Sequence, residues 1–427
     1  MSLFYRFSRH VIKPHKQTRS IWVRLTATGA NVHDCADISL ATLEKKSPNV
    51  CVVLASKSFT LKNYKDLICE LNIKLNKPSV MMGGVIDRVP HVDHGISLLL
   101  GFDEHVVPFT ITDDQHRLKI RNTAVGRWGR QDDVIRLKYQ NDHLDNVNWE
   151  NFGSINTPVQ PFQLPSSLEN SLKTVPSFLF TLSDNEPEQL LQTFDHHYAN
   201  VPKVGLIGAS TPFVTGEPYC LFRGEEIMGS GIVGFASYGA QQLQDMKVCH
   251  TAMEKLGKPM KITRCQGNVI LDVEAGGATG LLLQLIQHCG PLSKDEEFYA
   301  GIYPLEENEL DESMRVSRIT SGDPSRGNMS IDTTADLQVG QTIQFLRKKT
   351  VETIKNVSSD TMIKDNIIFG VSEKDDTIDM MPIKIPNQAN VIKDCFGGVS
   401  ENGVILGRSH MSSELLDVPF SKVMFKL

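Results

Sequence analysis

The pattern of apolar residues near the start of the globular region predicts strands interleaved with a helix. The run NVCVVLAS at residues 49–56 is apolar and rich in β-branched residues, as expected for a buried strand. Residues 64–75 have the apolar spacing of a helix, and the runs at 79–84 and 95–102 predict two further strands. This order of strand, helix, strand and strand is typical of an α/β fold.

The same order recurs in the middle of the chain. Residues 177–184 form an apolar run, residues 186–198 have helical spacing, and residues 203–210 form a run that ends in small side chains. The recurrence suggests an internal duplication of 49–84 and 177–210, although any α/β protein repeats strand, helix and strand. The predicted fold class is α/β, with two related lobes of mixed β-sheet flanked by helices.

A hairpin is predicted at residues 257–273, GKPMKITRCQGNVILDV, where apolar and polar residues alternate on both sides of one break. The break at 266–268, Gln-Gly-Asn, supplies a turn, because Gly and Asn tolerate positive φ. Alternation places Val269, Leu271 and Val273 on one face of the second strand. We therefore expect these three side chains to be buried.

The first residues have a different composition. Six basic residues precede Asp34 and no acidic residue does, and a helix would place apolar and basic side chains on opposite faces. This composition is typical of a mitochondrial transit peptide, so residues 1–35 are predicted to direct the chain to mitochondria, into the matrix. A basic tail without a targeting role is the alternative. In either case the segment is expected to lie outside the fold.

Composition limits the remaining possibilities. The 427 residues are 40% hydrophobic and 22% charged, which is ordinary for a chain with two globular domains. The net charge of −6 gives no reason to expect nucleic acid as a partner. Eight cysteines without a C-x-x-C pair indicate reduced, mostly buried thiols. No apolar run approaches the roughly 18 residues of a transmembrane helix, so no transmembrane segment is expected.

The sequence lacks common catalytic and metal-binding motifs, which gives little support to an enzymatic function. The sequence contains no G-x-x-x-x-G-K-[ST], H-E-x-x-H or G-x-S-x-G pattern, so no catalytic residue, cofactor or metal ligand is predicted. The stretch at 195–197, Asp-His-His, is expected at the end of a surface helix, where neighbouring side chains diverge. The stretch at 91–94, His-Val-Asp-His, is expected in a loop before a strand.

Several longer stretches resemble the FIST family (F-box and intracellular signal transduction). The stretch LGKPMKITRCQGNVILDVEAGGATGLL at 256–282 and the stretch SRITSGDPSRGNMSIDTTADLQVGQTIQFLRK at 317–348 are similar to two family motifs. The segments at 178–210 and 220–236 resemble the amino-terminal half of the family. The resemblance covers most of 45–427. One departure is the position of Cys249, which puts any role of that residue in doubt.

The resemblance implies a FIST N-like domain at 36–240 and a FIST C-like domain at 241–427. Bacterial members look like sensory input domains with amino acids suggested as ligands, whereas the F-box member is an adaptor. We therefore expect a non-catalytic protein that binds a small ligand such as an amino acid or another carboxylate, and no F-box is seen. A protein-interaction scaffold and an enzyme of unrecognised type are the alternatives, so the partner is a small molecule or a protein.

Candidate ligand-binding residues come from two places. The turn SGDPSRGN is flanked by arginines, and a carboxylate would suit an arginine fork, although a hairpin turn with solvated arginines is the alternative. The stretch GLIGAST resembles a phosphate loop but lacks the lysine, so close packing of small residues is the alternative. The candidate ligand-binding residues are Arg318, Asp323, Arg264, Gly208 and Ser210.

Overall fold

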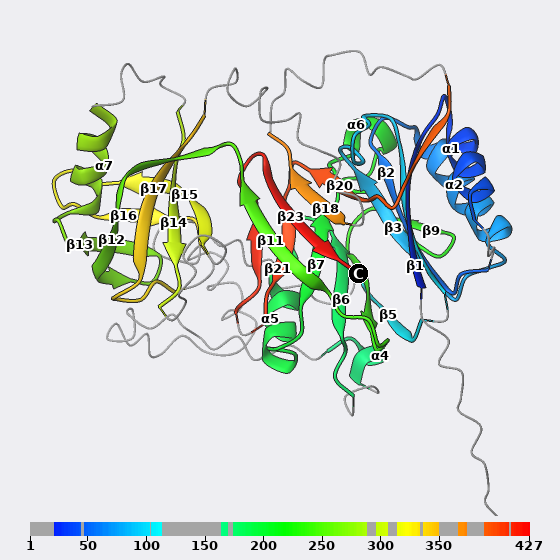
Figure 1. Ribbon diagram of the computed structural model, residues 1–427, viewed down its shortest axis with the longest axis horizontal. Helices are drawn as coiled ribbons and strands as arrows, with labels where there is room; N and C mark the ends of the chain where they lie inside the picture. Colours follow the sequence, from blue (N-terminus) through cyan, green and yellow to red (C-terminus); the bar gives the residue numbers. More distant parts are fainter. Residues whose placement is uncertain are drawn as a thin grey trace, which may run out of the picture.

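The structure is a computed structural model. It describes residues 21–43, 47–102, 104–112, 164–169, 174–287, 296–305, 314–333, 336–349, 366–373, 388–409 and 411–427. Within these residues the chain forms three mixed β-sheets, a closed barrel and short helices, so the α/β class predicted from the sequence is confirmed (Figure 1).

The first sheet is built around the predicted strand–helix–strand motif, which we call the first unit. Strand β2 (Val50–Ser56) leads through α2 (Leu61–Lys74) into β3 (Val80–Ile86), which runs parallel to β2. Strand β4 (Gly95–Phe102) returns antiparallel beside β2, and β1 (Ile21–Thr28) lies antiparallel beside β4. The strand order of the unit is therefore β3-β2-β4-β1.

The second sheet repeats this arrangement and contains the second unit. Strand β6 (Phe178–Ser183) leads through α5 (Glu188–His197) into the parallel strand β7 (Lys203–Ile207). Strand β10 (Ile232–Ser237) lies antiparallel beside β6, and β5 (Val106–Ile111) lies antiparallel beside β10. The order β7-β6-β10-β5 matches that of the first unit, as expected for related lobes.

A third unit, which the sequence did not predict, has the same topology. Strands β18 (Ile367–Val371) and β20 (Phe396–Ser400) are parallel neighbours. Strand β23 (Ser421–Lys426) lies antiparallel beside β18, and β11 (Gln244–His250) lies antiparallel beside β23. The order β20-β18-β23-β11 repeats the pattern once more. The repeated element is therefore present three times.

One close backbone contact occurs at the same register in all three units. In each unit a glycine of the second parallel strand lies opposite a residue of the first, and a Cβ on that glycine would overlap the carbonyl oxygen of its partner. The pairs are Gly83 with Val53, Gly205 with Thr181, and Gly397 with Ile368. Three identical registers with the same residue type indicate that the units arose by repetition of one element.

The units also exchange segments, and this exchange joins them into one body. We call the stretch between the second parallel strand of a unit and its returning strand the crossing segment. The crossing segments of the second and third units form hairpins that pair with β3 and β7, respectively, each in the preceding unit. The crossing segment of the first unit contacts β20 of the third unit through an antiparallel bridge between Arg88 and Val399. The hairpins are β8 (Leu221–Arg223) with β9 (Glu226–Met228), and β21 (Val404–Gly407) with β22 (Glu414–Leu416).

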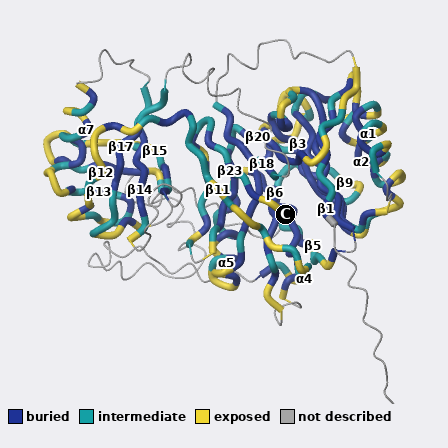
Figure 2. The backbone as a smooth tube through the Cα atoms, viewed as in Figure 1, coloured by how far each residue is buried: buried dark blue, intermediate teal, exposed yellow. Residues whose placement is uncertain are grey.

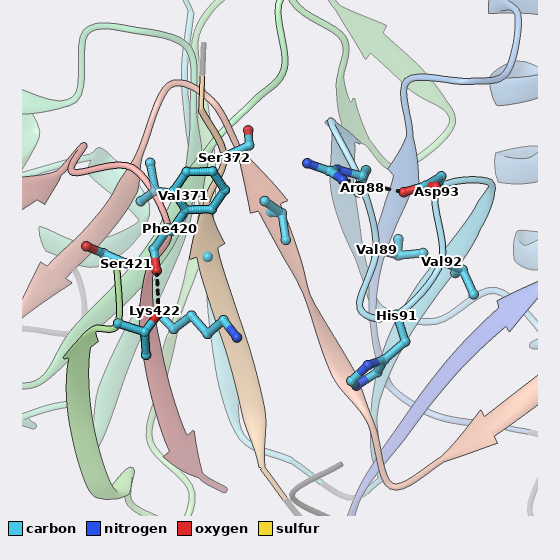
Figure 3. Close-up of a pocket in the computed structure, with 13 residues that line it drawn as sticks. Arg88, Val89, His91, Val92, Asp93, Val371, Ser372, Phe420, Ser421 and Lys422 are labelled. Carbon is cyan, nitrogen blue, oxygen red and sulfur yellow. Dashed lines mark hydrogen bonds and ion pairs between the residues drawn. The ribbon is translucent and has the colours of Figure 1, made fainter. Parts of the chain in front are cut away.

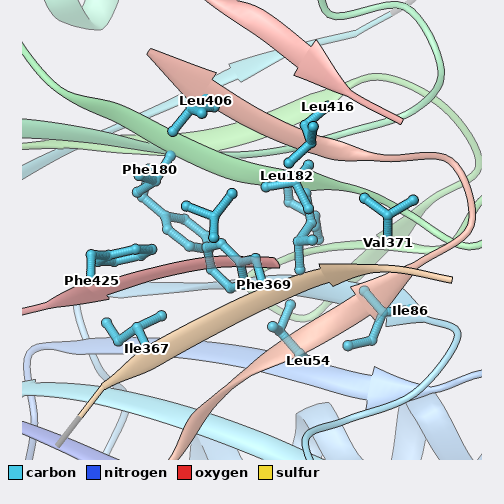
Figure 4. Packing of buried hydrophobic residues seen from close by; sticks show 14 of the residues in the cluster. Leu54, Ile86, Phe180, Leu182, Ile367, Phe369, Val371, Leu406, Leu416 and Phe425 are labelled. Carbon is cyan, nitrogen blue, oxygen red and sulfur yellow. The ribbon is translucent and has the colours of Figure 1, made fainter. Parts of the chain in front are cut away.

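A shared hydrophobic core lies between the three sheets. Leu54, Leu182 and Phe369 each follow the residue opposite the glycine, and all three are completely buried. Figure 4 shows these side chains together with Ile86 and Phe180 in one cluster. Buried residues follow the strands of the sheets, whereas exposed residues gather at loops and on the outer sides of helices (Figure 2).

The closed barrel interrupts the third unit between β11 and β18 and lies at one end of the molecule (Figure 1). It has a separate core and carries α7 (Ala278–Gln287). Its strands, in spatial order, are β12 (Met253–Gln266), β13 (Val269–Val273), β16 (Met329–Ile331), β15 (Arg315–Gly322), β14 (Phe298–Tyr303) and β17 (Thr342–Lys348). The remaining described elements are α4 (Ser166–Glu169), α6 (Pro212–Thr215) and β19 (Asn390–Lys393).

The fold begins earlier than the sequence analysis expected. Strand β1 lies between β4 and β19 in the first sheet, and its Trp22 and Leu25 are buried. The boundary at residue 35 would also cut α1 (Val32–Ala41), whose Asn31 caps the helix by accepting from Asp34 N. The exclusion of residues 21–35 from the fold was therefore wrong, because the acid-free composition extends into the first strand. Residues 1–20 lie outside the described residues.

The predicted hairpin exists, but its buried face differs from the expected one. Ile270 and Val273 are buried, whereas Val269 and Leu271 are only partly buried. The reason is that the register between β12 and β13 shifts twice, around Arg264, so simple alternation fails there. Leu271 is consequently not a core residue, and the prediction that placed it in the core was wrong.

The glycine contact gives a direct test of the strand packing. We expect Gly205→Ala to destabilise the protein by about 1–3 kcal/mol or more, because its Cβ would meet the backbone of β6 rather than a movable side chain. Gly280→Ala in α7 is the matched control, since nothing lies within 4 Å of a Cβ there. That variant should be stabilised by up to about 1 kcal/mol through helix propensity. Urea unfolding measures both, and an unaffected Gly205→Ala protein would contradict the close approach.

Candidate functional site

A pocket of about 360 Å³ lies where the first unit meets the third. One wall is the crossing segment after β3, and the other is formed by the end of β18 and the start of β23 (Figure 3). We call this cavity the third-unit pocket. Its lining residues are Arg88, Val89, His91, Val92, Asp93, Thr251, Gly370, Val371, Ser372, Val399, Phe420, Ser421 and Lys422.

Comparison of the units gives a physical reason for a cavity at this place. In the first unit, the side chain of Ser56 accepts a hydrogen bond from Gly95 N at 3.0 Å. In the second unit, Asp184 accepts from Gly231 N at 2.6 Å. The strand register places Val371 at the equivalent position of the third unit, and its side chain cannot accept a hydrogen bond. The side-chain hydrogen bond that joins the two strands at this position in the first and second units is therefore missing in the third, beside the pocket.

Two residues that line the pocket adopt a left-handed backbone conformation. His91 has φ of 64° and Phe420 has φ of 60°. Such a conformation is an outlier for a bulky residue such as Phe, and strained residues cluster at functional sites. The carbonyl oxygen of Phe420 accepts from Thr251 Oγ1 at 3.3 Å, and its amide donates to Val371 O at 2.9 Å. These contacts hold the strained backbone against the pocket.

Basic side chains face the pocket from both walls. Figure 3 shows Arg88 and His91 pointing from the crossing segment toward the β18 side, with Lys422 pointing back from β23. Arg88 forms an ion pair of 3.6 Å with Asp93, which is 60% exposed. Within the described part of the chain, the side-chain ammonium group of Lys422 has no hydrogen-bond or ion-pair partner. The pocket therefore combines an apolar wall with positively charged groups from two units.

A histidine lies directly behind this wall. His250 Nδ1 and Ser421 Oγ are 2.7 Å apart, across the pair of strands β11 and β23. Burial, with a smaller effect of the nearby Arg408 charge, lowers the pKa of His250 to about 4. Ser421 is completely buried, so its hydroxyl is not placed to attack a substrate. The hydrogen bond between His250 and Ser421 is better explained as a structural contact that joins β11 to β23.

The residues predicted from the sequence are not brought together. Arg264 is 69% exposed and pairs with Asp272 at 2.8 Å, and Arg318 pairs with Glu297 at 2.5 Å. Their strands, β12 and β15, are separated in the barrel by β13 and β16. Asp323 is partly exposed and accepts from Ser325 Oγ at 2.6 Å and from Ser325 N at 2.8 Å within its own turn, and these hydrogen bonds lower its pKa.

The other two predicted residues lie in the second unit. Gly208 follows β7, donates from its amide to Ser183 O, and accepts from Asn402 Nδ2 at 2.9 Å. Ser210 is exposed. None of the five predicted residues lines the third-unit pocket. Sequence reasoning missed Arg88 and Lys422, although it noted the neighbouring stretch at 91–94 and placed it in a loop, where the structure also has it.

The two family-like stretches of the barrel meet each other and form structure. Thr279, at the start of α7, donates from its amide to Gly327 O at 3.1 Å. A Cβ on Gly277 would lie 2.7 Å from Gly327 Cα, so only glycine allows this approach. The turn SGDPSRGN therefore packs against the first turn of α7, and its glycines serve that contact.

The described cysteines mostly agree with the expected buried thiols. Burial raises the pKa of Cys35, Cys51 and Cys220 to about 12, so these thiols stay protonated and unreactive. Cys249 and Cys265 are partly buried, and Cys69 is exposed. The stretch at 195–197 lies at the end of α5, as predicted, and Asp195 there pairs with the buried Lys203 at 3.0 Å.

Comparison with known families agrees with these observations. Residues 79–275 match the family described as the FIST N domain, which indicates a signal-transduction or ligand-sensing domain. Over these residues the chain is similar to the FIST N domain, and the match extends from β3 of the first unit through the second unit and into the barrel. No curated protein matches the sequence. In the described residues, no helix is long and apolar enough to cross a membrane.

The lowered pKa of His250 gives a prediction about stability. The unfolded-state value is about 6.5, so the unfolded chain takes up the proton first as the pH falls. Stability from this group is therefore complete above pH ~6.5 and is lost as the pH falls toward 4, by about 2 kcal/mol between pH 7 and pH 5. We expect His250→Gln to remove this part of the pH dependence in urea unfolding. Parallel pH profiles of the variant and the wild type would contradict the assignment.

Proposed function

We propose that this protein binds a small carboxylate-bearing ligand, an amino acid or another carboxylate, in the third-unit pocket. The observation that carries the proposal is the convergence of Arg88 and Lys422 from two units on one apolar cavity. A guanidinium group is suited to a carboxylate, and a lysine without a partner supplies a second positive charge. The cavity lies at the lower end of the usual volume range of ligand pockets, about 300–1,000 Å³.

The position of the pocket also supports a sensory role. Thr251 lines the pocket two residues before β12, the strand that enters the barrel, and Lys349, directly after β17, donates from Nζ to Thr251 O at 2.8 Å. Lys348 forms an ion pair with Glu373 and lies 5.6 Å from the ring centre of Phe420. A ligand that moves Phe420 would therefore change contacts at both connections to the barrel. The barrel is the part of the molecule best placed to transmit such a change.

A role as an interaction scaffold or adaptor is the second candidate. Its support is α6, where Phe213 is fully exposed and Val214 is 40% exposed. Exposed aromatic residues are typical anchors of protein interfaces. Affinity capture with the wild type and with Phe213→Ala separates the two functions, since this substitution lies outside the third-unit pocket. Loss of a partner without any change in ligand binding would favour the scaffold.

We also propose that the protein enters the mitochondrial matrix, with the targeting information before Ile21. Five of the six basic residues that precede Asp34 lie within residues 1–20, and this segment contains no acid. Residues 1–20 fused to a fluorescent reporter should reach mitochondria, and a diffuse cytosolic signal would contradict the proposal. A chain that starts at Ile21 should fold, whereas one that starts at residue 36 should not, because it lacks β1.

A thermal-shift screen against amino acids and small carboxylates tests the proposed site. A ligand at 100 times its Kd should stabilise the protein by about 2.7 kcal/mol. We expect Lys422→Met to lose this stabilisation while its melting temperature without ligand stays close to that of the wild type. Lys426→Met is the control, because this exposed lysine of the same strand pairs with Asp245 outside the pocket. Equal ligand shifts in both variants would exclude the third-unit pocket as the site.

A further inference from the structure

We infer that the ligand of the third-unit pocket is a carboxylate with a compact apolar body and without an ammonium group. The inference rests on the proposed function and narrows its ligand class, because it separates carboxylic acids of this kind from α-amino acids.

The wall offers a largely apolar surface to the body of a ligand. Val89 and Val371 are buried behind it, and Val92, Val399 and Phe420 complete it. These side chains come from both units, so an apolar group between them is enclosed from two sides. Transfer of such a group from water contributes about 25 cal/mol per Å² of buried apolar surface. A branched aliphatic or aromatic group suits this surface better than a charged or strongly hydrated one.

The charges of the pocket do not suit an ammonium group. Among the described residues that line the pocket, Asp93 is the one acidic side chain, and it is exposed and already paired with Arg88. The basic groups of Arg88 and Lys422 would repel a further positive charge. An ammonium group in the cavity would lose water without gaining a carboxylate of its own, which is unfavourable. A carboxylate, in contrast, gains two positively charged partners.

The hydroxyl groups of the wall also limit the ligand. Thr251 donates to Phe420 O, and Ser421 is engaged by His250. Two of the three hydroxyl side chains that line the pocket therefore already have partners. A sugar or another polyol needs several partners in a buried site, since unpaired polar groups are costly there. A ligand with one carboxylate and an apolar body needs fewer hydrogen-bond partners from the lining hydroxyl groups than a polyol does.

Three compounds that share one carbon skeleton test the inference by calorimetry on the full-length protein. They are leucine, its α-keto acid and the methyl ester of that acid, which lacks the negative charge. We expect the keto acid to bind at least about tenfold more tightly than either of the others, which corresponds to about 1.4 kcal/mol. Lys422→Met should weaken binding of the keto acid by a similar factor, and Lys426→Met should leave it unchanged.

A second variant keeps the test valid if Lys422→Met folds poorly. Arg88→Gln removes the second positive charge of the pocket from a side chain that is 42% exposed, and it should weaken binding of the keto acid by about tenfold. Leucine binding as tightly as the keto acid would overturn the inference and leave the proposed function standing. Equal binding of the ester would show that the negative charge is not recognised, and would also overturn it. If no compound of the wider screen binds, the proposed function fails as well.

Discussion

The close approach of two parallel strands at a glycine is the contact on which the three sheets depend. At Gly83, Gly205 and Gly397 the neighbouring backbone occupies the space of a Cβ, so the two strands can pair in one register only. This register places Leu54, Leu182 and Phe369 in the shared core. Because the three units meet there, a shift in one pair would disturb the packing of the other two.

The exchange of crossing segments explains why the candidate site lies between units. Each unit leaves the edge of its second parallel strand open, and a segment from another unit covers it. The segment around Arg88 is short and makes a single bridge to β20, whereas the other two form complete hairpins. A short segment covers less of the strand edge. The cavity beside β18 is consistent with this incomplete cover.

The sequence predicted elements more successfully than their pairing. The apolar run at 49–56 and the helical spacing at 64–75 are local signals, and both elements formed as expected. The third unit was missed because the barrel separates its strands β11 and β18 along the chain. The buried face of the 257–273 hairpin was misassigned because two register shifts lie outside any alternation rule. Arg88 and Lys422 could not be paired from sequence, since their proximity depends on the exchange between units.

Repetition followed by local change gives a consistent account of the site. A repeated element supplies three equivalent strand ends, and in two of them a polar side chain, Ser56 or Asp184, ties the returning strand to its neighbour. At the third, the side chain of Val371 cannot form this tie, and the link is made instead by the amide of the strained Phe420, which donates to Val371 O at 2.9 Å. The barrel is inserted in this same unit, between β11 and β18. The strand that ends at Val371 is therefore also the strand that the chain enters on leaving the barrel. A pocket at either of the other ends would have no comparable route to the barrel.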